Sequence, residues 1–268
     1  MYFRIDSKKC MRNILKISSL LLLTLISCKK ESTSNSEIDS AIIIDTREQL
    51  NNDRQTLLLV CTTQKIYGCG NYSIHYKIDK TTNRIDIAFE GIKTPNICLT
   101  SLGPATTFID LGTLPIGLYQ LNLTINRTVK KGELVVTPDR YSISIPNQTQ
   151  IQLPKSTLPR IPSNTIWGTI GYNKASSEPM AQSVVDALIQ TGATTQTYAE
   201  GNYWYFNIGT NGQILSPQNH GYWFVKPFIL QYLGDIDKIK TLLQQIKTQY
   251  GNELHVTINT SKGEVLYN

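Results

Sequence analysis

Histidine is scarce in this 268-residue sequence, and charged residues make up only 17% of it. The three histidines, His75, His220 and His255, are scattered and do not have the spacing of metal ligands. A nucleophile elbow, a Walker phosphate loop and a zincin helix are all missing from the sequence. These absences exclude the usual signatures of hydrolases, nucleotide-dependent enzymes and zinc enzymes. We therefore expect no metal and no cofactor.

The sequence has only one long apolar run, residues 17–26. This run is shorter than the ~20 residues that cross a bilayer. A short basic stretch precedes it, and Leu25-Ile26-Ser27-Cys28 closes it. This order resembles the type II signal peptide of bacterial lipoproteins. The resemblance implies that residues 1–27 are removed, with Met11 as an alternative start, and that Cys28 carries the lipid. Lys29 after the cysteine implies the outer membrane, and residues 28–40 are expected to form a polar tether.

An excess of basic charge is also missing from the predicted mature chain. The formal charge of the whole sequence is +6, but residues 1–27 account for +4 of it. From Arg160 onward, seven basic residues balance seven acidic ones. Residues 220–226 resemble the RNP1 motif of RNA-recognition domains, yet Trp223 stands where that family has glycine or alanine. Without the charge that drives nucleic-acid affinity, we expect no nucleic-acid partner.

The mature cysteines other than Cys28 are only three: Cys61, Cys69 and Cys98. Residues 72–79 and 84–90 are predicted to form a hairpin, and Cys69 and Cys98 flank its two open ends. A Cys69–Cys98 disulfide is therefore geometrically plausible and would suit an oxidising compartment. Pairing of Cys61 with either of the other two stays open, because spacing does not determine connectivity.

Over residues 41–147 the sequence predicts short strands separated by turns, at 56–62, 72–79, 84–92, 106–111, 117–125, 131–137 and 141–145. Several alternate polar and apolar residues, as in 117–125, where Tyr119, Leu121 and Leu123 share one face. About seven such strands predict an immunoglobulin-like β-sandwich. Residues 148–164 contain Pro154, Pro159 and Pro162 and are expected to form a linker, because proline disfavours helix and removes a ladder donor.

The pattern changes in residues 165–268, where strands alternate with two amphipathic helices. The first helix is expected to begin near Ser177 and end at Gly192, and the second to begin at Asp235 or Asp237 and end at Gly251. The expected order is β-α-β-β-α-β with a short final strand. The strands are expected at 165–172, 202–210, 222–233 and 254–259, and the short final strand at 264–267. This order predicts an α+β domain of ferredoxin-like type, with both helices on one face of the sheet.

Such a domain leaves one sheet face without helices, and aromatic residues are expected to line it. A row of aromatic rings can stack on sugars or on a protein partner. The alternative is that this face is covered by the sandwich domain, by the final strand or by a second copy of the chain, because large apolar patches are usually covered. We therefore expect a binding or assembly module that contacts a glycan or another envelope protein. The alternative is a hydrolase or transferase with a dispersed active site, built from Asp186, Glu200, Glu253, His220 and His255. The residues expected on the binding face are Trp167, Tyr203, Tyr205, Tyr222, Phe224 and His255.

Overall fold

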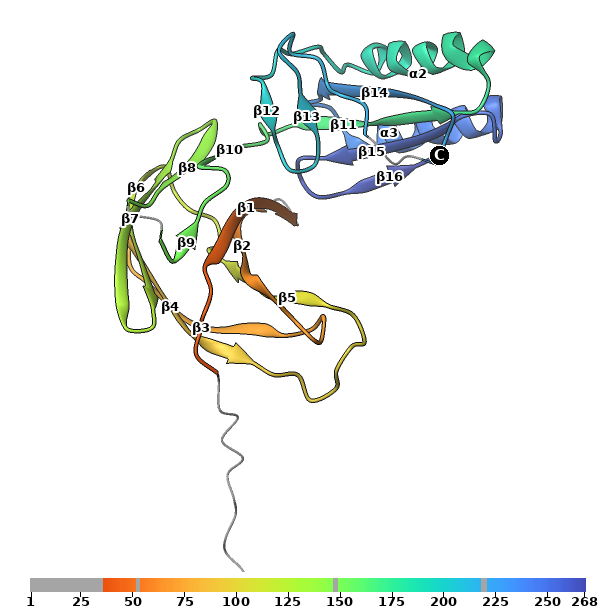
Figure 1. The fold of residues 1–268 in the computed structure, drawn as a ribbon. Coiled ribbons are helices and arrows are strands. Elements are labelled where there is room, and N and C mark those ends of the chain that lie inside the picture. Colours follow the sequence, from red (N-terminus) through yellow and green to blue (C-terminus); the bar gives the residue numbers. More distant parts are fainter. Residues whose placement is uncertain (1–35, 52–53, 147–148, 218–220) are drawn as a thin grey trace, which may run out of the picture. The chain divides into compact units, whose positions relative to one another are not determined.

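The computed structural model describes residues 36–51, 54–146, 149–217 and 221–268 (Figure 1). The expected signal peptide, the Cys28 lipidation site, most of the tether and His220 lie outside the described residues. No helix in the described part of the chain is long and apolar enough to cross a membrane. The lipid anchor therefore stays a prediction.

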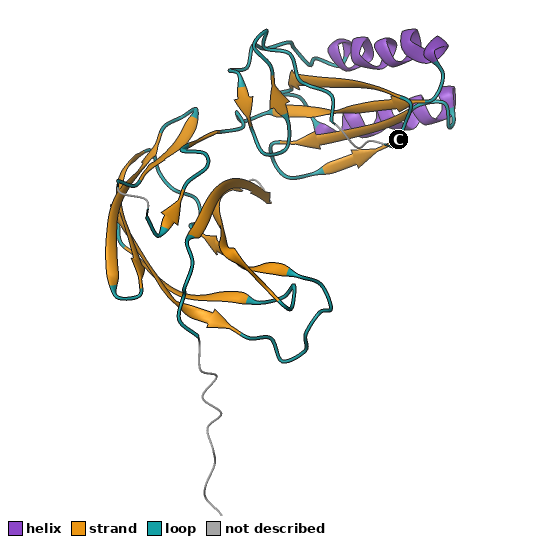
Figure 2. Ribbon diagram, viewed as in Figure 1, coloured by secondary structure: helices purple, strands orange, loops and turns teal. Residues whose placement is uncertain are grey.

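Residues before Thr165 form two β-sheets that share one apolar core, as in a β-sandwich (Figure 2). Alternate residues of each strand point into this core, for example Ile42 and Ile44 on one sheet and Leu121 and Leu123 on the other. The first sheet has the order β5 (Gly103–Asp110), β2 (Arg54–Tyr67), β1 (Ile42–Asn51), β9 (Ile151–Gln152). The second sheet has the order β10 (Thr157–Pro159), β8 (Arg140–Ser144), β7 (Thr128–Val136), β6 (Gly117–Ile125), β4 (Arg84–Lys93), β3 (Ser73–Lys80).

Two features of this region differ from the sequence-based expectation. Strand β1 was not among the predicted runs, although it pairs along its whole length with β2. The proline-containing segment that we expected to act as a linker contributes β9, which pairs in parallel with β1, and β10, which pairs with β8. Pro159 fits because β10 is an edge strand.

A buried carboxylate ties β1 to β8 and to the segment after β10. Glu48 is fully buried, accepts a hydrogen bond from the Ile161 backbone N–H at 2.9 Å and contacts the Tyr141 hydroxyl at 3.3 Å. The Arg160 guanidinium lies 3.9 Å from the same carboxylate. Burial raises the pKa of Glu48 to about 7, although these three neighbours act to lower it.

The remaining residues form a second unit of mixed secondary structure. Its sheet has the order β14 (Phe224–Gln231), β11 (Thr165–Tyr172), β15 (His255–Thr260), β16 (Val265–Tyr267), and all neighbours are antiparallel. Helices α2 (Glu178–Gln190) and α3 (Ile236–Tyr250) share a core with Ile166, Ile170 and Tyr172 of β11. Of the two caps that the sequence offers, Asp235 is the one that caps α3, and its side chain accepts the Asp237 N–H.

The second strand expected over Asn202–Thr210 does not join this sheet. It forms a separate two-stranded sheet of β12 (Gly201–Asn202) and β13 (Asn207–Ile208). The four residues between these strands make a tight turn in which Tyr203 N–H donates to the Phe206 carbonyl. Trp204 sits in this turn with a φ of +71°, a left-handed conformation that bulky residues rarely adopt.

Candidate functional site

In the β14-β11-β15-β16 sheet, the face opposite the helices divides into two halves. On β11, Ile166, Ile170 and Tyr172 point to the helices, so Trp167, Thr169 and Gly171 point to the other face. The register places His255 beside Gly171, Thr257 beside Thr169 and Asn259 beside Trp167. Among the described residues, the half around Trp167 is covered by the segment around β12 and β13. The half that contains Thr169, His255 and Thr257 is more open, because these residues are only half-buried.

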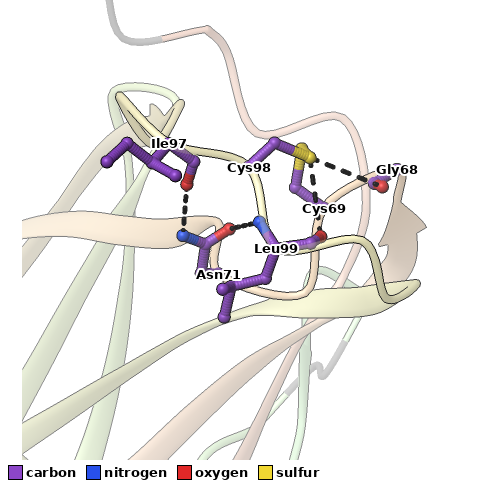
Figure 3. Close-up of a disulfide and its surroundings, with 6 residues drawn as sticks. All are labelled: Gly68, Cys69, Asn71, Ile97, Cys98 and Leu99. Atoms are coloured by element: carbon purple, nitrogen blue, oxygen red, sulfur yellow. Dashed lines mark hydrogen bonds between the residues drawn. A yellow bond between two sulfur atoms is a disulfide. The ribbon is translucent and has the colours of Figure 1, made fainter.

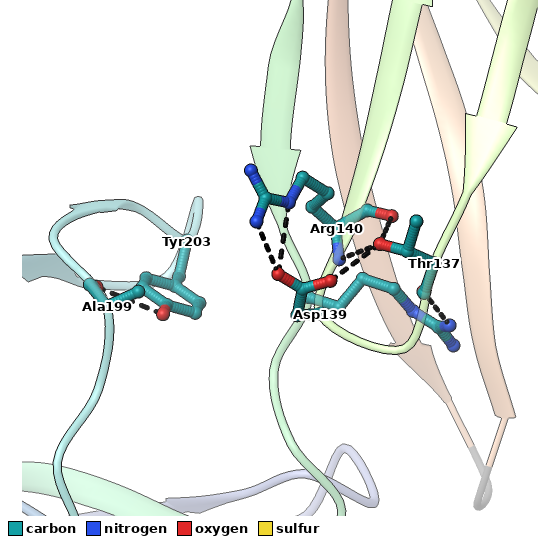
Figure 4. A network of polar contacts seen from close by, with 6 residues as sticks. Thr137, Asp139, Arg140, Ala199 and Tyr203 are labelled. Atoms are coloured by element: carbon teal, nitrogen blue, oxygen red, sulfur yellow. Dashed lines mark hydrogen bonds and ion pairs between the residues drawn. The ribbon is translucent and has the colours of Figure 1, made fainter.

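The covered half is an aromatic cluster closed by the segment around β12 and β13. Trp167 is only 4% exposed and packs against Phe206, with ring centroids 5.2 Å apart, and against Tyr205 at 5.7 Å. Tyr203 is also buried, stacks on Phe206 and donates its hydroxyl to the Ala199 carbonyl at 3.1 Å (Figure 4). The expectation that Trp167 and Tyr203 line an open face is therefore wrong. They lie in a core beneath a turn.

Trp204 and Tyr205, the two residues between Tyr203 and Phe206, are partly exposed but contact β1. The Arg47 guanidinium lies 4.9 Å from the centroid of the Trp204 ring. The Tyr205 hydroxyl accepts a hydrogen bond from the Leu50 backbone N–H at 3.3 Å. Both rings make contacts within the chain, so less of their surface is accessible to a ligand.

The more open half carries an aromatic strip, which we define as Tyr222, His255 and Tyr267. The Tyr222 ring lies where a side chain at Gly171 would project and stacks on His255, with centroids 5.0 Å apart and planes 24° apart. Tyr267 pairs with Thr257, two residues along the same face from His255, and is 68% exposed. Trp223, the next residue after Tyr222, is 82% exposed. Tyr267 is exposed, while Tyr222 and His255 are half-buried, so the strip presents aromatic rings at the surface beside the half-buried Thr169 and Thr257.

Phe224 lies on the opposite face of the sheet from the strip. Its register partner is Tyr172, and the two rings stack with centroids 5.5 Å apart. Because Tyr172 belongs to the helix-side core, Phe224 points toward the helices. Its predicted place on the binding face is wrong, because β14 begins only at residue 224 and the alternation does not extend back to Tyr222.

Two of the carboxylates proposed for a dispersed active site, Asp186 and Glu253, have polar partners within the chain. Asp186 accepts a hydrogen bond from Gln182 one turn earlier on α2, and Glu253 lies 3.6 Å from Lys174. Glu200 lines a hollow of about 320 Å³ that also touches Asp139 and Tyr203. Within that hollow, Thr137 and Arg140 donate to Asp139 and lower its pKa (Figure 4). Over the described ranges, no group of three His, Cys, Asp or Glu side chains is arranged to hold a metal ion.

Comparison with known proteins gives no further assignment: no family model, no curated protein and no solved structure matches the chain. The arguments that follow therefore depend on the residues and their geometry.

Proposed function

We propose that this protein is a lipid-anchored lipoprotein of the bacterial cell envelope that binds a glycan through the aromatic strip. The observation that carries the proposal is the Tyr222–His255 stack, which lies on the sheet face that the helices do not cover. Rings presented in this way stack on the C–H faces of sugars. The hydroxyls of Thr169 and Thr257, which are paired on the same face, add groups that can hydrogen-bond to sugar hydroxyls.

The lipid anchor and the outer-membrane location follow from the lipobox at Leu25–Cys28 and from Lys29. The Cys69–Cys98 disulfide supports export, because disulfides persist in oxidising compartments. We also propose the finer fold assignments. The two-sheet region is an immunoglobulin-like sandwich. The second unit is a ferredoxin-like domain in which the residues around β12 and β13 replace the second strand.

A second candidate function is assembly with another envelope protein through the same strip. The exposed Trp223 and Tyr267 favour it, since aromatic side chains are enriched at the centres of protein interfaces. The binding experiments below separate the two, because a glycan ligand acts without a second protein.

Replacing Tyr222 with alanine should weaken retention of the mature chain on an insoluble cell-wall polysaccharide about tenfold, because one stacking ring is lost. Pull-down with the polysaccharide measures the retention. Phe224→Ala is the matched control, since it removes an aromatic ring two residues away on the opposite face. Equal retention of Tyr222→Ala and the unaltered chain would contradict glycan binding at the strip.

Gly171→Ala should weaken the same retention without removing any aromatic group. A Cβ atom at Gly171 would collide with the Tyr222 ring and push it away from His255. The backbone of Gly171 does not have a positive φ, so alanine introduces this collision without backbone strain. Gly117→Ala, where the nearest atom lies 4.0 Å away, is the matched control. The polysaccharide pull-down again gives the readout, and unchanged retention would show that the position of Tyr222 is irrelevant.

The anchor has its own test, which is independent of the strip. Cells that express the full chain should incorporate labelled palmitate into it, and Cys28→Ala should abolish the incorporation. Label that persists in the Cys28→Ala chain would contradict the anchor.

A further inference from the structure

Three large aliphatic side chains project from one end of the sandwich, in the connection between β4 and β5. Ile97, Leu99 and Leu102 are 79%, 56% and 79% exposed, and we call them the apolar tip. No charged residue occurs from residue 94 to residue 104. Exposed aliphatic residues gathered in this way mark interaction sites rather than ordinary surface.

The backbone beneath the apolar tip is held in place by several cross-links (Figure 3). Cys98 forms a disulfide with Cys69, at a Cα–Cα distance of 5.2 Å. The Asn71 side chain donates to the Ile97 carbonyl at 2.8 Å and accepts from the Leu99 N–H at 3.1 Å. A loop fixed in this way loses little conformational entropy on binding, so its apolar side chains are pre-organised for a partner.

The tether enters the sandwich at the same end. Ser36, the first described residue, exchanges two backbone hydrogen bonds with Ile92, near the end of β4. The Ala41 carbonyl accepts from Gln64 near the end of β2, and β2 leads directly to the Cys69 loop. Cys28 is eight residues before Ser36, a separation that extended chain spans in at most about 28 Å. A lipid on Cys28 would therefore hold this end of the sandwich close to the membrane.

We propose that the apolar tip inserts into the surface of a phospholipid membrane beside the lipid anchor. This inference rests on the proposed lipidation of Cys28, and it adds a second membrane contact that the anchor alone does not supply. Membrane attachment by acyl chains is strengthened by such a second signal. Apolar side chains enter the boundary between headgroups and acyl chains, and exposed Lys93 at the edge of the loop can contact lipid phosphates. With both contacts, the sandwich is fixed at the membrane rather than suspended on a free tether.

Vesicle binding by an unlipidated chain tests the tip separately from the anchor. A chain that begins at residue 28 and carries Cys28→Ser retains every described element, because all of them lie in residues 36–268. It should co-sediment with vesicles of phosphatidylethanolamine and phosphatidylglycerol. The double change Ile97→Ser and Leu102→Ser should weaken this association by about tenfold or more, because two apolar side chains no longer leave water.

The matched control changes two other exposed aliphatic residues, at the other end of the sandwich. Ile116 and Leu118 are 64% and 58% exposed; Ile116 precedes β6 and Leu118 is its second residue, and β6 runs parallel to β4. The double change to serine there should leave vesicle association unchanged. Circular dichroism of each variant confirms that the fold is retained.

Three results would overturn the proposal: no vesicle association of the unlipidated chain, equal loss in the control, or a tip variant that alters only the oligomeric state in sedimentation velocity. The last result would assign the tip to a second copy of the chain. Palmitate labelling of Cys28 is read out independently, so failure of the anchor and failure of the tip are distinguishable.

Discussion

Replacing Glu48 with glutamine is expected to stabilise the protein at about pH 8 and to leave its stability nearly unchanged at about pH 4. Burial raises the pKa of Glu48 in the folded chain from 4.5 to about 7. Between these two values the unfolded chain loses the proton while the folded chain keeps it, so stability falls as the pH rises through this window. Above about pH 7 Glu48 is ionised in both states, and its ionisation in the buried site lowers the stability of the folded chain by about 3 kcal/mol relative to low pH.

Glutamine mimics the protonated carboxyl and can still accept a hydrogen bond from the Ile161 N–H, so the variant should not lose stability as the pH rises. Urea unfolding at a series of pH values measures the difference. Glu133→Gln is the matched control, since Glu133 is an exposed carboxylate on β7. A Glu48→Gln chain that is less stable than the unaltered chain at about pH 8 would show that ionised Glu48 stabilises the fold through Arg160.

Removing the Cys69–Cys98 disulfide is expected to lower the free energy of unfolding by about 3–4 kcal/mol. The bond joins residues 29 positions apart, and without it the unfolded chain regains the entropy of that loop. Denaturant unfolding of the Cys69→Ser, Cys98→Ser double variant measures the loss. A reductant should lower the stability of the unaltered chain to the same level and should leave the double variant unaffected.

Cys61 provides an internal check on this experiment. It is a fully buried free thiol, and burial raises its pKa well above the ordinary range, so it should not react in the folded state. Oxidised and reduced chains of equal stability would contradict the stabilising role of the disulfide.

The strands of the sandwich were largely predictable because each buries one face. Residues 119–125 alternate apolar and polar positions in the sequence, and the structure buries Tyr119, Leu121, Leu123 and Ile125. The Cys69–Cys98 disulfide was also predictable, because the two cysteines flank the open ends of a hairpin, which lie close together. Parallel pairing of β4 with β6 was not predictable, because it depends on contacts distant in the sequence.

The aromatic face was predicted only in part. The sequence predicts that Tyr203, Trp204 and Tyr205 lie in one strand with alternating faces. Instead, the Asn202 side chain accepts the Trp204 N–H and closes a turn, so period-two reasoning fails there. Asparagine after Gly201 was the available turn signal.

His255 and Tyr222 do lie together, but their contact depends on the missing side chain of Gly171. Tyr267, the third member of the strip, was missed because the final strand was not assigned a face.

Tryptophan fluorescence of the chain from residue 29 onward, titrated with cell-wall oligosaccharides, tests the central claim most directly. All three tryptophans lie in residues 165–268, and Trp223 adjoins Tyr222 at the strip. We expect a saturable spectral shift that is lost in Tyr222→Ala and retained in Phe224→Ala. No shift with any oligosaccharide, or the same shift in Tyr222→Ala, would contradict glycan binding at the aromatic strip.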